Sequence, residues 1–160
     1  MIAGLITPSG NLAALTPLPV IVSPIAGEAV AVGDLVRFDL GSDNAYSVLA
    51  NITNYDEPTC GFNVVVKTVA GNEAGIFGVV VTAAAAGARC TVCVAGVCEA
   101  KITGTTTKGT TPLINGAGVL APAATAGTGV GLAIGLADNS GGPNLRQVFF
   151  YGIQIGTQSA

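Results

Sequence analysis

The four cysteines are the residues whose type and spacing come nearest to a chemical site. Cys90 and Cys93 form a C-x-x-C motif, Cys98 follows five residues later, and Cys60 stands alone. C-x-x-C motifs occur in thiol redox centres and in zinc sites. A strand would place Cys90 and Cys93 on opposite faces, whereas a thioredoxin-type centre needs the motif at a helix N-terminus. Because a four-cysteine zinc site normally uses two such motifs, the pattern favours small buried thiols over either centre.

Cys93 and Cys98 are predicted to lie opposite each other in a β-hairpin. Residues 88–94 and 97–102 are both strand-like, and residues 95–96 between them have the length of a two-residue turn. In that register the two Cβ atoms would be about 4.5–5.5 Å apart. A disulfide prefers about 3.8 Å, so such a bond would form with some strain. The sequence therefore leaves two alternatives for Cys93 and Cys98: a disulfide or a pair of buried free thiols.

The glycine-rich stretch from Gly127 to Gly135 imitates a dinucleotide-binding loop. A true loop of this kind lies between a strand and a helix, with an acidic residue about 20 positions further on. Residues 130–137 have the composition of a strand instead, and the nearby acid is Asp138. We therefore expect glycines that permit close strand packing, and no bound nucleotide or other cofactor.

The composition excludes several classes of function. The chain has no histidine, so it holds no Ser-His-Asp triad, no Cys-His pair and no histidine metal ligand. Six basic residues among 160 argue against nucleic-acid binding. Pro, Gly, Thr or Asn interrupts every apolar stretch before 18 residues, so no membrane span is predicted. We expect a protein that is not an enzyme and that needs neither cofactor nor metal.

The elements that would position these residues are predicted to be short β-strands. The chain has 23 glycines, and only 5% of its residues are aromatic. Val36, Phe38 and Leu40 alternate with Leu35, Arg37 and Asp39, which is the period of a half-buried strand. Further strands are expected within residues 46–52, 62–69, 79–82, 130–137 and 147–155, and a turn is expected at Asn115-Gly116. We predict an all-β domain over residues 26–160, either a compact β-barrel or a β-sandwich.

Residues 1–25 differ from the rest, because they contain no charged side chain and four prolines. Proline favours extended backbone, so we expect an extended N-terminal arm that packs on a neighbouring subunit. An ordinary first strand is the alternative. The first basic residue is Arg37, so no secretory signal is predicted and synthesis in the cytosol is expected. With 50% hydrophobic and 9% charged residues, burial in a symmetric oligomer or a large assembly is expected.

Several blocks of the sequence resemble a known family. GDLVRF at 33–38, residues 75–102, residues 108–138 and a closing hydrophobic strand are similar to the small head-decoration (cement) proteins of tailed bacteriophages. Lys108-Gly109, Pro112-Leu113, residues 116–118 and residues 131–135 fall where that family has its Lys-Gly turn and its final strands. Three features depart from the family pattern: the cysteines around residues 90–98, the missing aromatic after the Lys-Gly turn, and the arm.

The resemblance implies a structural virion protein, made in the host cytoplasm, that binds the outer surface of the assembled major-capsid lattice and stabilises it. Its partners would be two further copies of itself, in a homotrimer, and the major capsid protein. We expect the arm to carry the contact. Two basic side chains would add to it by facing an acidic capsid surface, so the full candidate set is Ile2, Leu5, Ile6, Leu12, Leu15, Arg89 and Arg146.

Two other functions stay open. The chain is alternatively a host-surface or glycan-binding module of a phage head fibre, for which Tyr55 in a polar loop is the best aromatic candidate. A further alternative is another extracellular structural β-protein.

Overall fold

The computed structural model describes residues 18–39, 64–69, 75–123 and 131–151. These residues form ten β-strands and, within those ranges, no helix, which confirms the all-β prediction. The strands are β1 (Val20–Val22), β2 (Ile25–Ala26), β3 (Leu35–Phe38), β4 (Val64–Lys67), β5 (Ile76–Thr82), β6 (Thr91–Ile102), β7 (Pro112–Asn115), β8 (Leu120–Pro122), β9 (Ala133–Gly135) and β10 (Asn144–Phe150).

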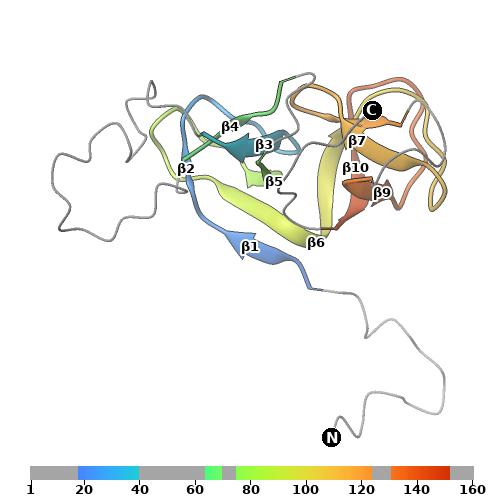
Figure 1. Cartoon of the computed structure of the whole chain (residues 1–160), viewed down its shortest axis with the longest axis horizontal. Helices are drawn as coiled ribbons and strands as arrows, with labels where there is room; N and C mark the ends of the chain where they lie inside the picture. The colour runs from blue at the N-terminus through green and yellow to red at the C-terminus, as the bar shows by residue number, and fades with distance from the viewer. Residues whose placement is uncertain (1–17, 40–63, 70–74, 124–130, 152–160) are drawn as a thin grey trace, which may run out of the picture.

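Five strands close into a small barrel of mixed direction, seen on the right in Figure 1. β6 pairs with β10, β10 with β9, β9 with β7 and β7 with β8, all antiparallel. The parallel pair Ile102–Leu120 then joins β8 back to β6. The barrel encloses apolar side chains, among them Leu113, Leu132 and Phe150, which are fully buried. Closure leaves these five strands without a free edge over their paired length.

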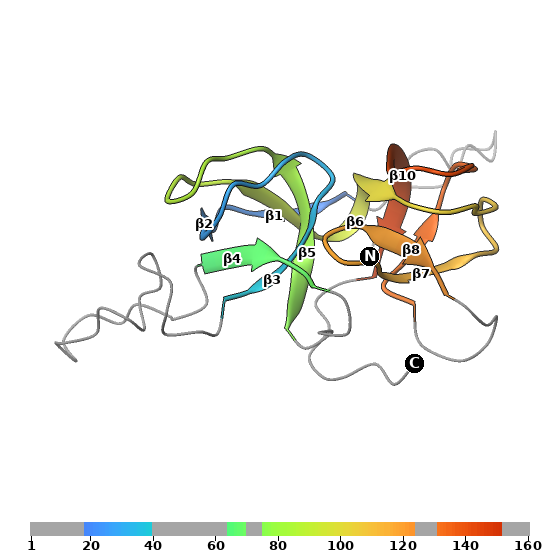
Figure 2. The same cartoon turned by 90° about the horizontal axis from the view of Figure 1, so that it is seen from above.

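The remaining strands form an outer sheet that shares β6 with the barrel, and Figure 2 shows the two parts side by side. The N-terminal half of β6 pairs with β5, and the sheet continues through β3 and β4 to β2. This sheet wraps a second cluster of buried apolar side chains, which includes Val36, Val65, Phe77, Val80 and Val92. β1 pairs with β6 on the side away from β5.

The hairpin predicted at residues 88–102 is wrong, because β6 is one continuous strand. Its two halves have different partners: Cys93 pairs with Val79 of β5, and Cys98 pairs with Val148 of β10. Gly96, with φ +98°, bends the strand between these pairings and does not reverse it. A Cβ atom at Gly96 would lie 2.9 Å from the Cα atom of Pro19. Glycine is therefore required here for a bend and a close approach.

Most other strand predictions agree with the structure. Strands are found at β3, β4, β5, β9 and β10 within or beside the expected ranges, whereas β7 and β8 were not expected. The strand expected at residues 46–52 lies outside the described residues. Gly131 and Gly135 are buried in and beside β9, as close strand packing requires.

Two polar contacts join the barrel to the segments around it. The Asn139 side-chain amide donates to the carbonyl oxygens of Ile102, Gly104 and Gly141 at 3.1, 2.7 and 2.7 Å. Lys101 in β6 forms an ion pair of 2.6 Å with Asp34, whose side chain is nearly buried. The first contact pins the loop before β10, and the second ties β6 to the turn before β3.

Candidate interaction surface

The described residues hold no cluster of three or more His, Cys, Asp or Glu side chains that could bind a metal ion. The same part of the chain contains no helix that could cross a bilayer. The most prominent surface feature is a group of exposed apolar side chains. Among the described residues eight large apolar side chains are exposed, and five of them gather around β1 and the end of β10. These five are Leu18, Val20, Ile21, Val81 and Tyr151, and together with the half-buried Phe149 we call them the apolar surface.

Strand pairing explains why these residues meet. β1 and β10 lie end to end along the same side of β6, because Val20 pairs with Ala95 and Phe150 pairs with Gly96. Phe150 faces the barrel core, so its neighbours on the strand face outward. The rings of Phe149 and Tyr151 stack edge to face with centroids 5.6 Å apart. Leu18, two residues before β1, is 87% exposed, and its backbone lies against Gly96, the pairing partner of Phe150.

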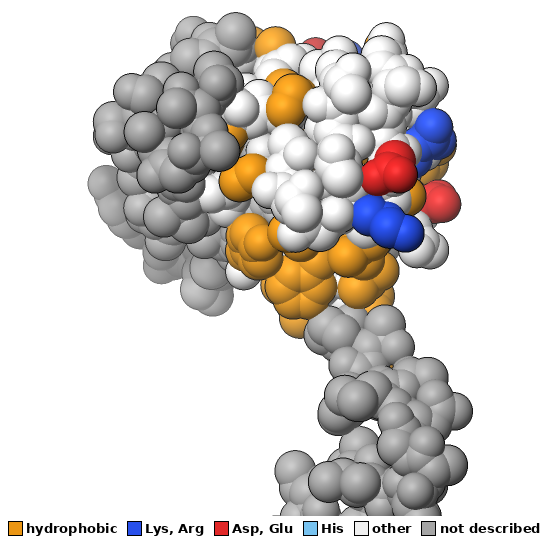
Figure 3. Space-filling model, turned by 90° about the vertical axis from the view of Figure 1, so that its right-hand side faces the viewer, with side chains coloured by type: hydrophobic (Ala, Val, Ile, Leu, Met, Phe, Trp, Pro, Cys, Tyr) orange, Lys and Arg blue, Asp and Glu red, His pale blue; other side chains and the backbone are white. Residues whose placement is uncertain are grey.

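Figure 3 shows the result on the surface of the molecule. Orange side chains gather along the lower margin of the body, whereas the Lys, Arg, Asp and Glu side chains in view lie to the right and at the top. A contiguous apolar area with charges at its rim is typical of a protein-binding surface.

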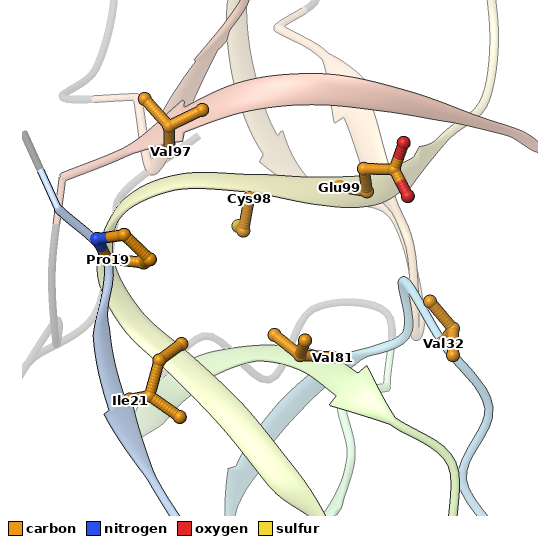
Figure 4. A pocket seen from close by; sticks show the side chains of 7 residues that line it. All are labelled: Pro19, Ile21, Val32, Val81, Val97, Cys98 and Glu99. Atoms are coloured by element: carbon orange, nitrogen blue, oxygen red, sulfur yellow. The ribbon is translucent and has the colours of Figure 1, made fainter. Parts of the chain in front are cut away.

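A groove of about 150 Å³ continues the apolar surface between β1, β5 and β6. Figure 4 shows the Cys98 thiol directed into the space between Ile21 and Val81. Glu99 supplies the groove's charged side chain, and the complete lining is Pro19, Ile21, Val32, Val81, Val97, Cys98 and Glu99. Such a lining suits an apolar side chain of a partner better than a polar ligand.

β1 also presents an unpaired strand edge. Within the described residues it pairs only with β6. The opposite end of the outer sheet is covered, because Ala26 of β2 exchanges backbone hydrogen bonds with Gly87 and Ala88 at 2.7 and 2.9 Å. Within the part of the chain that the structure describes, β1 therefore has one unpaired edge, and such an edge can accept a further strand.

The expected contact residues Ile2, Leu5, Ile6, Leu12 and Leu15, and Tyr55, lie outside the described residues. The described end of the expected arm, residues 18–25, contains β1 and the first of the two residues of β2, Ile25. The guanidinium of Arg89 donates to the Ser23 carbonyl oxygen at 2.8 Å, and that of Arg146 to the Asp138 carbonyl oxygen at 3.0 Å. Both cations thus support local backbone, one beside β1 and the other on the barrel.

Cys93 and Cys98 come together at the bend of β6. The Cys98 thiol donates a hydrogen bond to Cys93, which lowers the pKa of Cys93 from its ordinary value. The same hydrogen bond, with burial and the charge on Cys93, strongly raises the pKa of Cys98. Cys90 lies apart, with its thiol 3.7 Å from the Pro24 carbonyl oxygen, and burial raises its pKa. All three are free thiols in this structure, and Cys60 lies outside the described residues.

Sequence reasoning did not find the apolar surface, although one signal was available. The run Phe149-Phe150-Tyr151 closes a strand, and alternation must expose at least one of three consecutive aromatic residues. Val20, Ile21 and Val81 carry no comparable signal, because each is an ordinary strand residue whose exposure depends on its neighbours in space.

The fold is similar to that of a known phage protein. No protein-family model matches the chain, and no curated protein matches its sequence. Among solved structures, the chain superposes on the crystal structure of the head fiber gp8.5 N base of bacteriophage phi29 with a TM-score of 0.53. The match covers 87% of this chain and 99% of that chain, at 12% sequence identity. At this identity the likeness establishes a shared fold.

Proposed function

We propose that this chain is a structural protein of a tailed-phage head and attaches to the outer surface of the capsid through the apolar surface. The observation that carries the proposal is an exposed apolar surface with an open strand edge, on a fold that matches nearly all of a head-fibre base. The virion exterior is the proposed location. Apolar contact and strand pairing, more than charge, would hold the chain in place, because the full sequence has only six basic residues.

The attachment is proposed to be multivalent. A homotrimer presents three copies of the apolar surface, and linked contacts bind far more tightly than any one of them. Sites at which several capsid subunits meet exist only in the assembled lattice, so the chain would bind the lattice in preference to the free subunit. A ligand that binds only the assembled state stabilises that state.

Two roles for the attached protein are distinguished by what happens to the capsid. The structural likeness favours the base of a head fibre, which holds an appendage on the shell without needing to strengthen it. A cement protein, as the sequence resemblance implies, would raise the temperature at which capsids rupture. Both roles would use the apolar surface for attachment, and they differ in whether the attached protein raises the rupture temperature of the capsid.

Binding of the purified chain to capsids that lack it tests attachment. The double variant Leu18→Glu/Tyr151→Glu should abolish co-sedimentation with capsids, because it places two charges in the apolar surface. Val69→Glu is the matched control, since Val69 is also about half exposed but follows β4, on the other side of the molecule from β1 (Figure 1). Equal binding by the double variant and the control would exclude this surface as the contact.

Three further measurements test the oligomeric state, the nature of the contact and the role of the attached protein. Light scattering at micromolar concentration should give the mass of a trimer, and a monomer would contradict the multivalent model. Salt at about 0.5 M should remove little bound protein, because salt screens charges and leaves apolar contacts intact. Capsids with and without the protein are then heated: a higher rupture temperature indicates cement, and an unchanged one indicates a fibre base.

A further inference from the structure

Cys93 and Cys98 meet where β6 passes from the outer sheet to the barrel. On a regular strand, residues five positions apart face opposite sides. The left-handed backbone of Gly96 interrupts that alternation. Ile21, the pairing partner of Cys93, lines the same groove as Cys98, so the two thiols lie on one side of the bent strand and interact. Cys93 in turn donates to the Ala95 carbonyl oxygen at 3.3 Å. A disulfide between them requires the two sulfur atoms to approach to about 2.05 Å.

The pair is accessible from one side. Cys93 is fully buried, whereas Cys98 is partly exposed and lines the apolar groove. Figure 4 shows the Cys98 sulfur directed into the groove between Ile21 and Val81. A molecule as small as a peroxide can therefore reach Cys98. Cys90 does not share this access, since it packs in the cluster of the outer sheet and its thiol faces the Pro24 carbonyl oxygen.

We propose that Cys93 and Cys98 form an oxidisable dithiol, a covalent modification site that reacts with a peroxide and closes to an intramolecular disulfide. Peroxide converts the Cys98 thiol to a sulfenic acid and releases one water. The sulfur of Cys93 then attacks the sulfur of Cys98: the S–S bond forms, the S–O bond breaks, and the departing hydroxide leaves with the Cys93 proton as a second water. The two sulfurs lose two electrons, and the peroxide gains them.

The hydrogen bond between the thiols assists the second step, the attack of Cys93 on the oxidised Cys98. Loss of one proton from the pair leaves a single negative charge that the two sulfurs share through the remaining proton. Since the Cys98 thiol stabilises the thiolate form of Cys93, the pKa of Cys93 is lowered and Cys93 is suited to attack an oxidised Cys98.

The disulfide would fix the bend on which the apolar surface is built. It would bridge residues 94–97 and so clamp Gly96, against which Leu18 and Pro19 pack. Cys93 is also the pairing partner of Ile21 in β1. Oxidation would therefore stiffen the attachment of β1 to β6. The chemistry of the pair does not depend on the proposed function.

Peroxide treatment of the purified full chain, followed by intact-mass measurement, tests the proposal. The expected product has lost two hydrogen atoms and stays monomeric in denaturing, non-reducing electrophoresis. Trypsin cleaves after Arg89 and Lys101, so Cys90, Cys93 and Cys98 occur in one peptide. The Cys90→Ser variant leaves the proposed pair alone in that peptide and makes the assignment unambiguous.

Matched variants separate the pair from the other cysteines. Cys90→Ser and Cys60→Ser should still lose two hydrogen atoms, whereas Cys98→Ser should not. A disulfide that contains Cys60 or Cys90, or peroxide that adds oxygen to Cys98 without closing a bond, would overturn the proposal. The oxidised chain should unfold about 2–4 °C higher than the reduced chain, and reductant should reverse the change. An unchanged midpoint would overturn the stiffening of the bend.

Discussion

The barrel and the β1 edge of the outer sheet share the strand β6, but its two halves differ in how completely their neighbours are paired and buried. Along residues 96–102, β6 is paired with β10, and β8 closes the barrel beside it. Along residues 92–95, it carries β1, whose other edge is open within the described residues. The barrel buries Phe150 completely, whereas the surface at β1 leaves Leu18 87% exposed.

This difference suggests that the residues which stabilise the fold and the residues which bind a partner are separate sets. Side chains inside a closed barrel contribute to folding and cannot touch a partner. Side chains at an open edge lose little when the chain unfolds, because they are already in water, and so their apolar area is available for binding. This distinction can be tested by comparing variants of buried and exposed residues, ordered from the largest expected effect on the free energy of unfolding to the smallest.

Replacing Phe150 by Ala should destabilise the protein by about 3–5 kcal/mol, because it leaves a cavity in the barrel core. Phe149→Ala is the matched control on the same strand, since its side chain faces outward and is only partly buried. Denaturant unfolding measures both. We expect the control to lose much less stability while weakening capsid binding, and comparable losses would show that the two faces are not distinct.

Gly96→Ala should cost about 2–4 kcal/mol, because a Cβ atom there is strained by φ +98° and meets the backbone of Pro19. Gly109 provides the control: it also has a positive φ, of +72°, but a Cβ atom added there meets nothing within 4 Å. Gly109→Ala should therefore cost only about 1–2 kcal/mol. Hydrogen exchange should show faster exchange in β1 for the Gly96 variant alone; equal costs would mean that β1 does not pack closely on the bend.

Asn139→Ala should destabilise the barrel by about 1–3 kcal/mol, because three carbonyl oxygens lose their donor. Ser140→Ala, at the exposed neighbouring position, should leave the free energy of unfolding within about 0.5 kcal/mol. Urea unfolding of both variants measures the difference. A stable Asn139 variant would indicate that the loop before β10 is held by other contacts.

Leu18→Glu should leave the free energy of unfolding within about 0.5 kcal/mol, because the side chain is already exposed. The same change should lower capsid binding, read by co-sedimentation. Unfolding of this variant would place Leu18 in the core of the fold and remove the distinction between the two regions.

Local pattern predicted several strands well. β3 forms where Val36 and Phe38 were expected in a strand, but the strand is not half-buried, because Leu35 on the opposite face is as fully buried as Val36. Pattern failed at residues 95–96, where a short Ala-Gly dipeptide between two apolar runs has the composition of a turn and also that of a bend within one strand. The choice depends on whether the two halves pair with each other or with different strands, and here β5 and β10 supply those partners.

The sequence by itself determined the all-β class, the absence of histidine chemistry and the need to bury an excess of apolar residues, because these follow from composition and from alternation along the chain. Only the tertiary structure decided which apolar residues stay exposed and which thiols meet. Val20, Tyr151 and Gly96 are far apart in sequence, and they become neighbours because β1 and β10 lie end to end along a bent β6. Pairing over such distances depends on the whole fold, and no local pattern encodes it.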